Sequence, residues 1–182
     1  MVEDLGRAIR DLPKGPIELA PTMSAQGPEL SAALSKIMAG QDAIQEMLSK
    51  RDLPKATEQQ ADLDAVVDDA LRAWPLDPVL VNLAGYHLKN AYMLMYWDAI
   101  QAGRGPRDPL LERSERRFLE TLALDPTDPS SLNGLGNILF FRRDLDAAEF
   151  FHLAALAAAK QQGIAYPAAG HDLELVRQYK RS

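Results

Sequence analysis

Apolar residues recur along this chain at three- and four-residue intervals, the spacing of helices that bury one face. A clear example lies between residues 29 and 50, where Gln41 occupies the one polar position of an otherwise apolar stripe. The apolar positions of this stripe are Leu30, Leu34, Ile37, Ile44 and Leu48. So narrow a seam predicts a helix that packs side-on against the next helix of the chain, and a dimerising seam is the alternative.

Further stripes predict helices along the rest of the chain, separated by turns that contain proline or glycine. Proline suits the start of a helix, because the first turn makes no internal use of its missing N–H. The predicted helices cover residues 53–73, 78–102 and 108–124, two helices around a turn at 143–145 within 129–159, and residues 171–180. The helix over 78–102 is unusually long and holds four of the chain's twelve aromatic residues, Tyr86, Tyr92, Tyr96 and Trp97.

One segment of the chain occurs twice. Pro75-Leu76-Asp77-Pro78 is followed by Asn82 and Gly85, and Pro126-Thr127-Asp128-Pro129 is followed by Asn133 and Gly136. The two copies are offset by 51 residues, the distance from Gly85 to Gly136. Self-similarity at a period of about 20–50 residues indicates a helical repeat array. Each copy predicts a helix end, a turn, and a new helix with a small residue in its second turn.

Between residues 129 and 159 the chain carries Leu132, Leu135, Gly136 and Leu139, the turn Arg143-Asp144-Leu145, and Ala148, His152 and Ala155. Through these residues the segment resembles one tetratricopeptide repeat, a family of stacked antiparallel helix pairs. The preceding pair matches through Gly85, Phe118, Leu122 and Pro126, with Ser114 and Thr121 in place of alanines. A third pair is indicated by Arg51-Asp52-Leu53, which repeats the turn at 143–145.

The resemblance implies an all-α fold, a right-handed superhelix of about three antiparallel helix pairs. We expect this TPR-like α-solenoid to occupy residues 29–182 and to end in a C-terminal capping helix, because arrays need polar caps. Residues 1–28 contain several proline and glycine residues that interrupt any long element. Val2, Leu5, Ile9 and Leu12 are spaced to line one side of a short helix before these breaks. The segment predicts a loosely ordered arm, or an arm that folds back onto the array and covers its first apolar face.

Composition narrows the functional classes. Apolar residues make up 47% and charged residues 25%, which is an ordinary globular balance. The net charge of −6 disfavours nucleic acid as a partner, and the apolar stretches are too short to span a membrane. The absence of cysteine excludes disulfides and thiolate chemistry, and the charged first residues do not resemble a signal peptide. These features predict a cytoplasmic protein.

The sequence shows no pattern that predicts catalysis. None of the three histidines lies at metal-ligand spacing from another, and no nucleophile elbow or phosphate-binding loop is present. His152 takes a position that the repeat family fills with a packed aromatic residue, so we interpret it as a core histidine. We therefore expect no enzyme activity, no metal and no cofactor.

The resemblance implies that a partner lies along the concave face made by the first helix of each pair. On this chain that face would include Asn82, Tyr86, Lys89, Asn133, Asn137 and Phe140. Asparagine side chains can bind the backbone of an extended peptide, and the aromatic rings can pack its side chains. We expect a protein- or peptide-binding adaptor or scaffold. The alternatives are a homo-oligomerisation module, and a small-molecule sensor or enzyme with a pocket around Tyr86, Met93 and Trp97.

Overall fold

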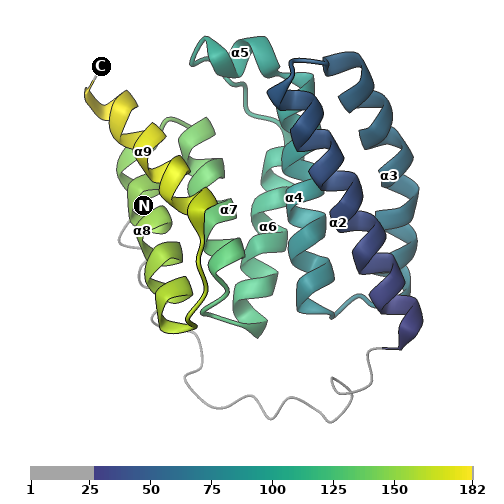
Figure 1. The fold of residues 1–182 in the computed structure, drawn as a ribbon. Coiled ribbons are helices and arrows are strands. Elements are labelled where there is room, and N and C mark those ends of the chain that lie inside the picture. The colour runs from purple at the N-terminus through teal and green to yellow at the C-terminus, as the bar shows by residue number, and fades with distance from the viewer. Residues whose placement is uncertain (1–26, 182) are drawn as a thin grey trace.

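The computed structural model describes residues 27–181, which form eight helices and no strand (Figure 1). The helices are α2 (Pro28–Ser49), α3 (Leu53–Ala73), α4 (Pro78–Met95), α5 (Trp97–Gln101), α6 (Pro109–Leu124), α7 (Pro129–Phe141), α8 (Leu145–Gln161) and α9 (Pro167–Arg181). The all-α prediction is confirmed. Of the predicted arm, residues 1–26 lie outside the described residues, and Pro28 already belongs to α2.

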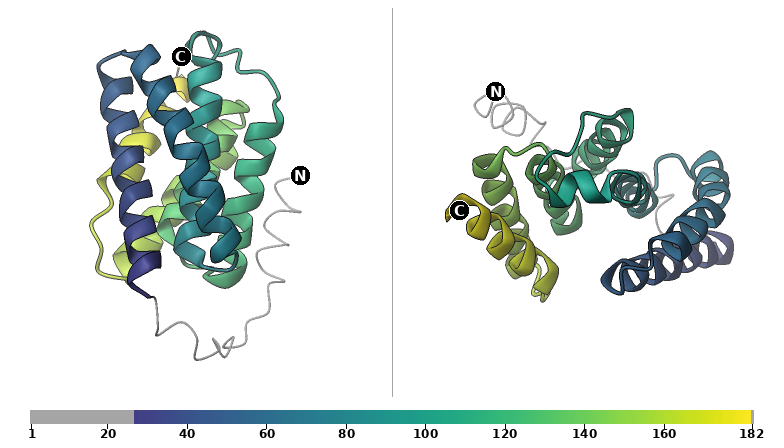
Figure 2. Two further views of the ribbon diagram at one scale, coloured as in Figure 1. Left: turned by 90° about the vertical axis from the view of Figure 1, so that its right-hand side faces the viewer. Right: turned by 90° about the horizontal axis from the view of Figure 1, so that it is seen from above.

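Neighbouring helices pack as sequential antiparallel pairs, α2 with α3, α4 with α6 and α7 with α8, and α9 packs on α8. The pairs are joined because α3 packs on α4 and α6 packs on α7. The first helices of successive pairs also touch, α2 with α4, α4 with α7, and α7 with α9. Seen from above, the helices form a curved layer with the α2–α3 pair at one end and α9 at the other (Figure 2).

The prediction of one continuous helix over 78–102 is wrong in one respect, because the helix breaks at Tyr96. The backbone of Tyr96 leaves the helical region (φ −120°, ψ 24°), and the short α5 lies across the upper end of the molecule (Figure 1). The Tyr96 hydroxyl donates to Asp108 Oδ2 (2.7 Å), and the Tyr92 hydroxyl donates to the Pro106 carbonyl (2.9 Å). These bonds hold the loop before α6 against the end of α4. The last helix also begins earlier than predicted, at Pro167.

The two Arg-Asp-Leu turns have the same backbone structure, as their shared sequence predicts. Arg51 and Arg143 both lie in the left-handed region, with φ of 58° and 63°. The following Asp52 and Asp144 donate their backbone N–H to a carbonyl five residues earlier and accept from the third following N–H through their side chains. This arrangement ends one helix and caps the next.

Small residues lie where helices approach closely, and these include Gly85 and Gly136 of the repeated segment. A Cβ on Gly85 would come within 2.7 Å of the Phe118 ring on α6, and one on Gly136 would come within 2.6 Å of the His152 ring on α8. Gly40 on α2 has the same relation to Leu63 on α3, at 2.8 Å. In each of the three helix pairs, a glycine therefore lies at a close contact between the two helices.

The buried side chains form two clusters. The first joins α2, α3 and the start of α4, and it contains the whole seam predicted between residues 29 and 50. That seam therefore packs within the chain, as we expected, and its side chains are not presented to a second copy. The second cluster joins Tyr92 of α4 with residues of α6, α7, α8 and α9. None of the described helices is long and apolar enough to cross a membrane.

Candidate functional site

Polar side chains gather where α4, α7 and α9 adjoin, on the side of the array formed by the first helices of the pairs. We call this set the α4–α7 polar cluster. Its members are Asn82, Tyr86 and Lys89 on α4, Asp128, Ser130, Ser131 and Asn133 at the start of α7, His152 on α8, and Tyr166 and Asp172 at the start of α9.

Asn82 joins α4 to the start of α7. Its Nδ2 donates to Ser131 Oγ (2.7 Å) and to Asp128 Oδ2 (3.2 Å), and its Oδ1 accepts from Ser130 Oγ (3.1 Å). Asp128 also caps α7 by accepting from the Ser131 N–H (2.7 Å). The Asp-Pro start of α7 thus presents its polar groups to α4. Because both ends of the amide are occupied, Asn82 stabilises the fold.

Tyr86 lies beside Asn82 on the same face of α4. Its hydroxyl donates to the Ser130 carbonyl (2.8 Å), and its ring meets Phe118 edge to face with 5.0 Å between centroids. Burial raises the pKa of Tyr86 well above its ordinary value, and the neighbouring Tyr166 raises it further. Burial also raises the pKa of Tyr166. The two phenols therefore stay protonated and act as hydrogen-bonding groups.

Lys89 is the cation of the cluster, and only 7% of its surface is exposed. Its Nζ lies 5.0 Å from the centroid of the Tyr86 ring, an attractive cation–π distance. Within residues 27–181, no carboxylate lies at ion-pair distance from Nζ. Burial lowers the pKa of Lys89 to about 8, and the field of Asp172 opposes that shift. The ammonium is thus held in a poorly solvated place with one aromatic partner.

Asn133 connects three helices. Its Nδ2 donates to Asp172 Oδ2 on α9 (2.9 Å), and its Oδ1 accepts from His152 Nδ1 on α8 (2.7 Å). His152 is fully buried, as predicted for a core histidine, and its Nε2 has no partner among the described residues. Burial lowers the pKa of His152, against the field of Asp172. The histidine is therefore neutral near pH 7 and fixed in the Nδ1-protonated form.

The remaining predicted residues lie further along α7. Asn137 is half-buried one turn after Asn133, and Phe140 is half-buried near the end of the helix. The Phe140 ring meets Tyr179 of α9 edge to face, with 5.2 Å between centroids. The Arg143 guanidinium also lies over the Tyr179 ring, 5.0 Å from its centroid. The structure thus brings together four of the six predicted residues and places Asn137 and Phe140 beside them.

The alternative pocket around Tyr86, Met93 and Trp97 is not assembled by the structure. Met93 and Trp97 pack against the first core cluster, whereas Tyr86 packs against the second. Helical spacing predicted one stripe, but α2 and α7 cover different parts of α4. The break at Tyr96 also separates Trp97 from the rest of the helix.

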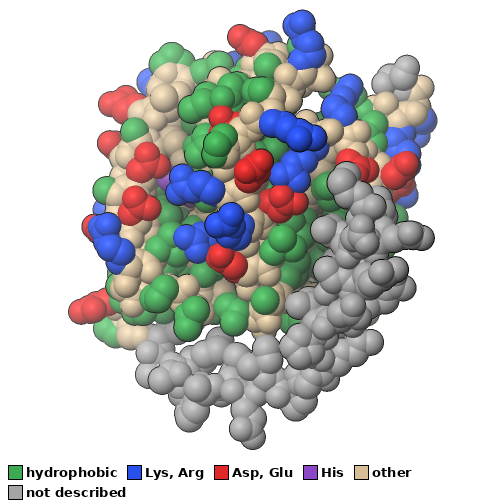
Figure 3. Space-filling view, turned by 180° about the vertical axis from the view of Figure 1, so that it is seen from behind, with side chains coloured by type: hydrophobic (Ala, Val, Ile, Leu, Met, Phe, Trp, Pro, Cys, Tyr) green, Lys and Arg blue, Asp and Glu red, His purple; other side chains and the backbone are tan. Residues whose placement is uncertain are grey.

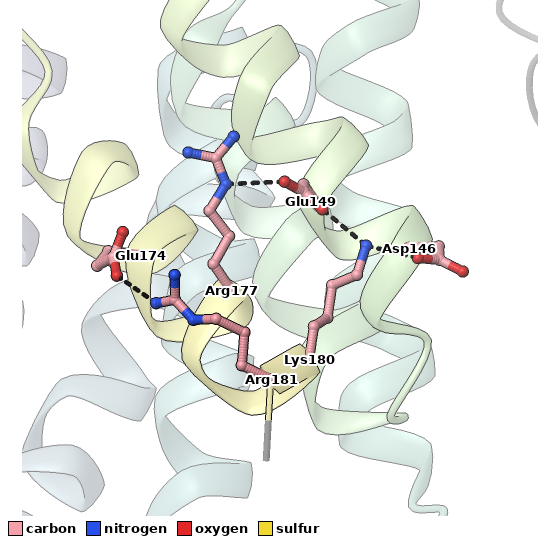
Figure 4. Close-up of polar contacts among 6 residues, drawn as sticks. All are labelled: Asp146, Glu149, Glu174, Arg177, Lys180 and Arg181. Carbon is pink, nitrogen blue, oxygen red and sulfur yellow. Dashed lines mark hydrogen bonds and ion pairs between the residues drawn. The ribbon is translucent and has the colours of Figure 1, made fainter.

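Sequence reasoning missed Tyr166 and Asp172, which complete the cluster from the far end of the chain. Neither belongs to the repeated segment, so no periodicity connects them with α4. Asp172 is positioned by α9, which four surface ion pairs hold to α8 or to itself (Figure 4). These pairs are Arg177–Glu149 (2.8 Å), Lys180–Glu149 (2.7 Å), Lys180–Asp146 (2.6 Å) and Arg181–Glu174 (2.9 Å).

Several charged and titratable groups outside the cluster form contacts within the chain. Acidic and basic side chains are interspersed on the face opposite to the view of Figure 1 (Figure 3). One such pair is Arg142 with Glu115, which is bidentate at 2.9 and 2.7 Å. His87 is buried between α3 and α4, with Nε2 2.5 Å from Asp64 Oδ1. The described residues contain no group of three or more side chains placed to hold a metal ion.

Comparison with known proteins leaves the family open. No protein-family model matches this chain, and no curated protein matches it. What the structure establishes is an all-helical protein whose described part consists of eight helices packed in sequential antiparallel pairs.

Proposed function

We propose that this protein is an adaptor or scaffold that binds another protein or a peptide along the face formed by α2, α4, α7 and α9. In this proposal the chain is a TPR-like array wound as a right-handed superhelix. The sequential pairs, the glycine at each pair's closest approach and the paired Arg-Asp-Leu turns support it. The cytoplasmic location expected from the sequence belongs to the same proposal.

The observation that carries the proposal is the burial of the Lys89 ammonium without an ion-pair partner among the described residues. Burial of an ammonium group without a carboxylate partner is unfavourable, and a protein could avoid it with an apolar side chain of similar length. Residues that violate the rules of stable packing are typical of functional sites. An acidic group of a bound partner would supply the opposite charge that Lys89 lacks within the described residues. Tyr86, which already contacts the ammonium, would flank that group.

Asn137 and Phe140 extend the proposed surface along α7. Both are partly exposed, so each can contact a partner without breaking the hydrogen bonds that hold the pairs together. The Asn137 amide offers a donor and an acceptor to an extended backbone, and Phe140 offers an aromatic surface. Asn82 and Asn133 have a different role, because their side chains are buried in bonds between helices.

The test is selection of binding peptides from a random peptide display library. The bait is the whole chain, and the selected peptides are then titrated against Asn137→Ala/Phe140→Ala and Lys89→Met. Phe150→Ala is the matched control, because Phe150 is an exposed aromatic residue on α8. We expect peptides with at least one acidic residue that lose affinity for the first two variants and keep it for the control.

Peptides that bind all variants equally would contradict the proposal, provided that circular dichroism shows each variant folded. Light scattering on the same samples examines the alternative of homo-oligomerisation. A stable dimer that persists in the Asn137→Ala/Phe140→Ala variant, without any selected peptide, would favour that alternative. Binding is expected to be non-covalent and to need no cofactor.

A further inference from the structure

The two ends of the array differ in how far they are covered by a further helix. At the C-terminal end, the outward side of α9 carries charged residues, including Glu174, Arg177 and Arg181, and all three are exposed. At the other end, α2 and α3 enclose an open groove of about 420 Å³. Helical arrays need a cap at each end. Within residues 27–181, α9 covers the last pair, and no further helix covers the groove of the first pair.

The groove is formed by the first pair alone. Its walls are Ala32, Ala33 and Lys36 on α2, Val66 and Ala73 on α3, and Trp74, which follows α3. Most of these side chains are apolar, and Ala32 and Ala73 are exposed. No residue of α4 contributes, because α4 packs elsewhere on the pair. The half-buried Trp74 is the largest side chain of the groove.

Of the two charged residues that line the groove, one has an ion-pair partner among the described residues and the other has none. Asp69 of α3 lines the groove and pairs with Arg72 of the same helix. Lys36 of α2 lies opposite and is exposed, and within the described residues it forms no ion pair. An occupant with apolar side chains and an acidic residue would therefore suit this groove.

We propose that the groove is the docking site of the chain's own N-terminal segment, residues 1–26, which lie outside the described residues. This segment carries the apolar stripe Val2, Leu5, Ile9 and Leu12, with acidic residues such as Asp11 beside it. It joins α2 at Gly27, and the groove begins in the first two turns of that helix. At up to about 3.3 Å per residue, the chain between Leu12 and Gly27 spans well over two helical turns. The segment thus supplies the missing cap in cis.

Trp74 is a direct probe of the groove. The chain has two tryptophans, so Trp97→Phe leaves Trp74 as the only one. In this background, Ile9→Asp/Leu12→Asp should shift the Trp74 emission to the red and increase its quenching by acrylamide. The matched control is Arg7→Gln/Arg10→Gln, which changes the net charge equally and leaves the apolar stripe intact. It should leave both signals unchanged.

A second measurement locates the contact. The chain contains no cysteine, so an engineered pair is unambiguous. Leu12→Cys with Lys36→Cys should form an intramolecular disulfide on mild oxidation, whereas Leu12→Cys with the distant Arg116→Cys should not. Unchanged Trp74 signals in the Ile9→Asp/Leu12→Asp variant would overturn the proposal. Crosslinked dimers in place of monomers, with signals that change on dilution, would also overturn it and assign the groove to a second copy.

Discussion

The His152 ring lies directly on the backbone of Gly136, so that a Cβ on Gly136 would come within 2.6 Å of its Cε1. In the preceding pair, Gly85 has the same relation to the Phe118 ring. The two glycines occupy corresponding positions of the repeated segment, yet they face different rings. Close approach of the helices is therefore the property that the two copies share.

The Gly136–His152 contact predicts that Gly136→Ala is destabilising. The added methyl group must displace a fully buried ring, which typically costs about 1–3 kcal/mol. Gly170→Ala on α9 is the control, because a Cβ there meets nothing within 4 Å. Alanine in that helix should stabilise the protein by roughly 0.5–1 kcal/mol. Urea unfolding of both variants measures the difference, and equal midpoints would contradict the predicted packing.

Lys89→Met should stabilise the protein while weakening the proposed binding. The pKa of Lys89 is about 8 in the folded chain and 10.5 ordinarily, so the unfolded chain takes up its proton first as the pH falls. Wild-type stability should therefore decrease as the pH is lowered from about 10 to about 8, and this component should be absent from the variant. Lys160→Met, on the exposed face of α8, should keep the wild-type dependence.

Unfolding free energies at several pH values between 8 and 10 provide the measurement for Lys89. The relevant quantity is the difference between wild type and Lys89→Met, because the other titratable groups are common to both proteins. A difference that does not change with pH would show that the Lys89 ammonium is well solvated.

His152 predicts a loss of stability in acid. Burial lowers its pKa from 6.5 in the folded state, so below about pH 6.5 the unfolded chain binds a proton that the folded chain does not. Stability should decrease as the pH falls through this range. His152→Phe should remove that component, at a cost of about 1–3 kcal/mol at pH 7.5 because Asn133 Oδ1 loses its donor.

The exposed His171 provides the comparison for His152. His171→Ala should reproduce the wild-type pH profile in thermal or urea unfolding between pH 5 and 7.5. If His152→Phe retained the full acid sensitivity, the carboxylates of the protein and not His152 would account for it.

The left-handed turns predict different effects on stability when the arginine of each turn is replaced by glycine. Glycine adopts this conformation without strain, so Arg51→Gly should stabilise the protein by about 0.5–1 kcal/mol. Arg143→Gly should gain the same amount but lose the contact with the Tyr179 ring, worth about 0.5–1 kcal/mol, and so change stability little. Thermal melting compares the two, and a larger gain for Arg143→Gly would contradict the Tyr179 contact.

The helix pairs were predictable because their signals are local. An Asp-Pro helix start, a glycine in the second turn and an Arg-Asp-Leu turn each act within a few residues, and all are found where the sequence indicates. The break at Tyr96 depends on a bond to Asp108, twelve residues further on and beyond any helical period. Apolar spacing continues through the break and therefore predicted one long helix.

Only those residues of the candidate site that lie on α4 and α7, the helices of the repeated segment, could be predicted from the sequence. Asn82, Tyr86, Lys89 and Asn133 were predicted from the resemblance to the repeat family, and the structure brings them together. Their burial did not follow, because it depends on Ser130 and Ser131 bonding to α4 and on Asp172 of α9 reaching Asn133. A single sequence does not indicate which exposed face a later helix will cover.

Helix α4 contributes to both core clusters, with Leu80 and Ala84 in the first and Tyr92 in the second. A stack whose repeats touched only their neighbours could fray pair by pair from either end. Here the disruption of either cluster exposes apolar surface on the same helix, which couples the two halves of the described chain energetically. Hydrogen exchange should therefore show one slowest-exchanging unit centred on α4, and not separate protection levels for each pair.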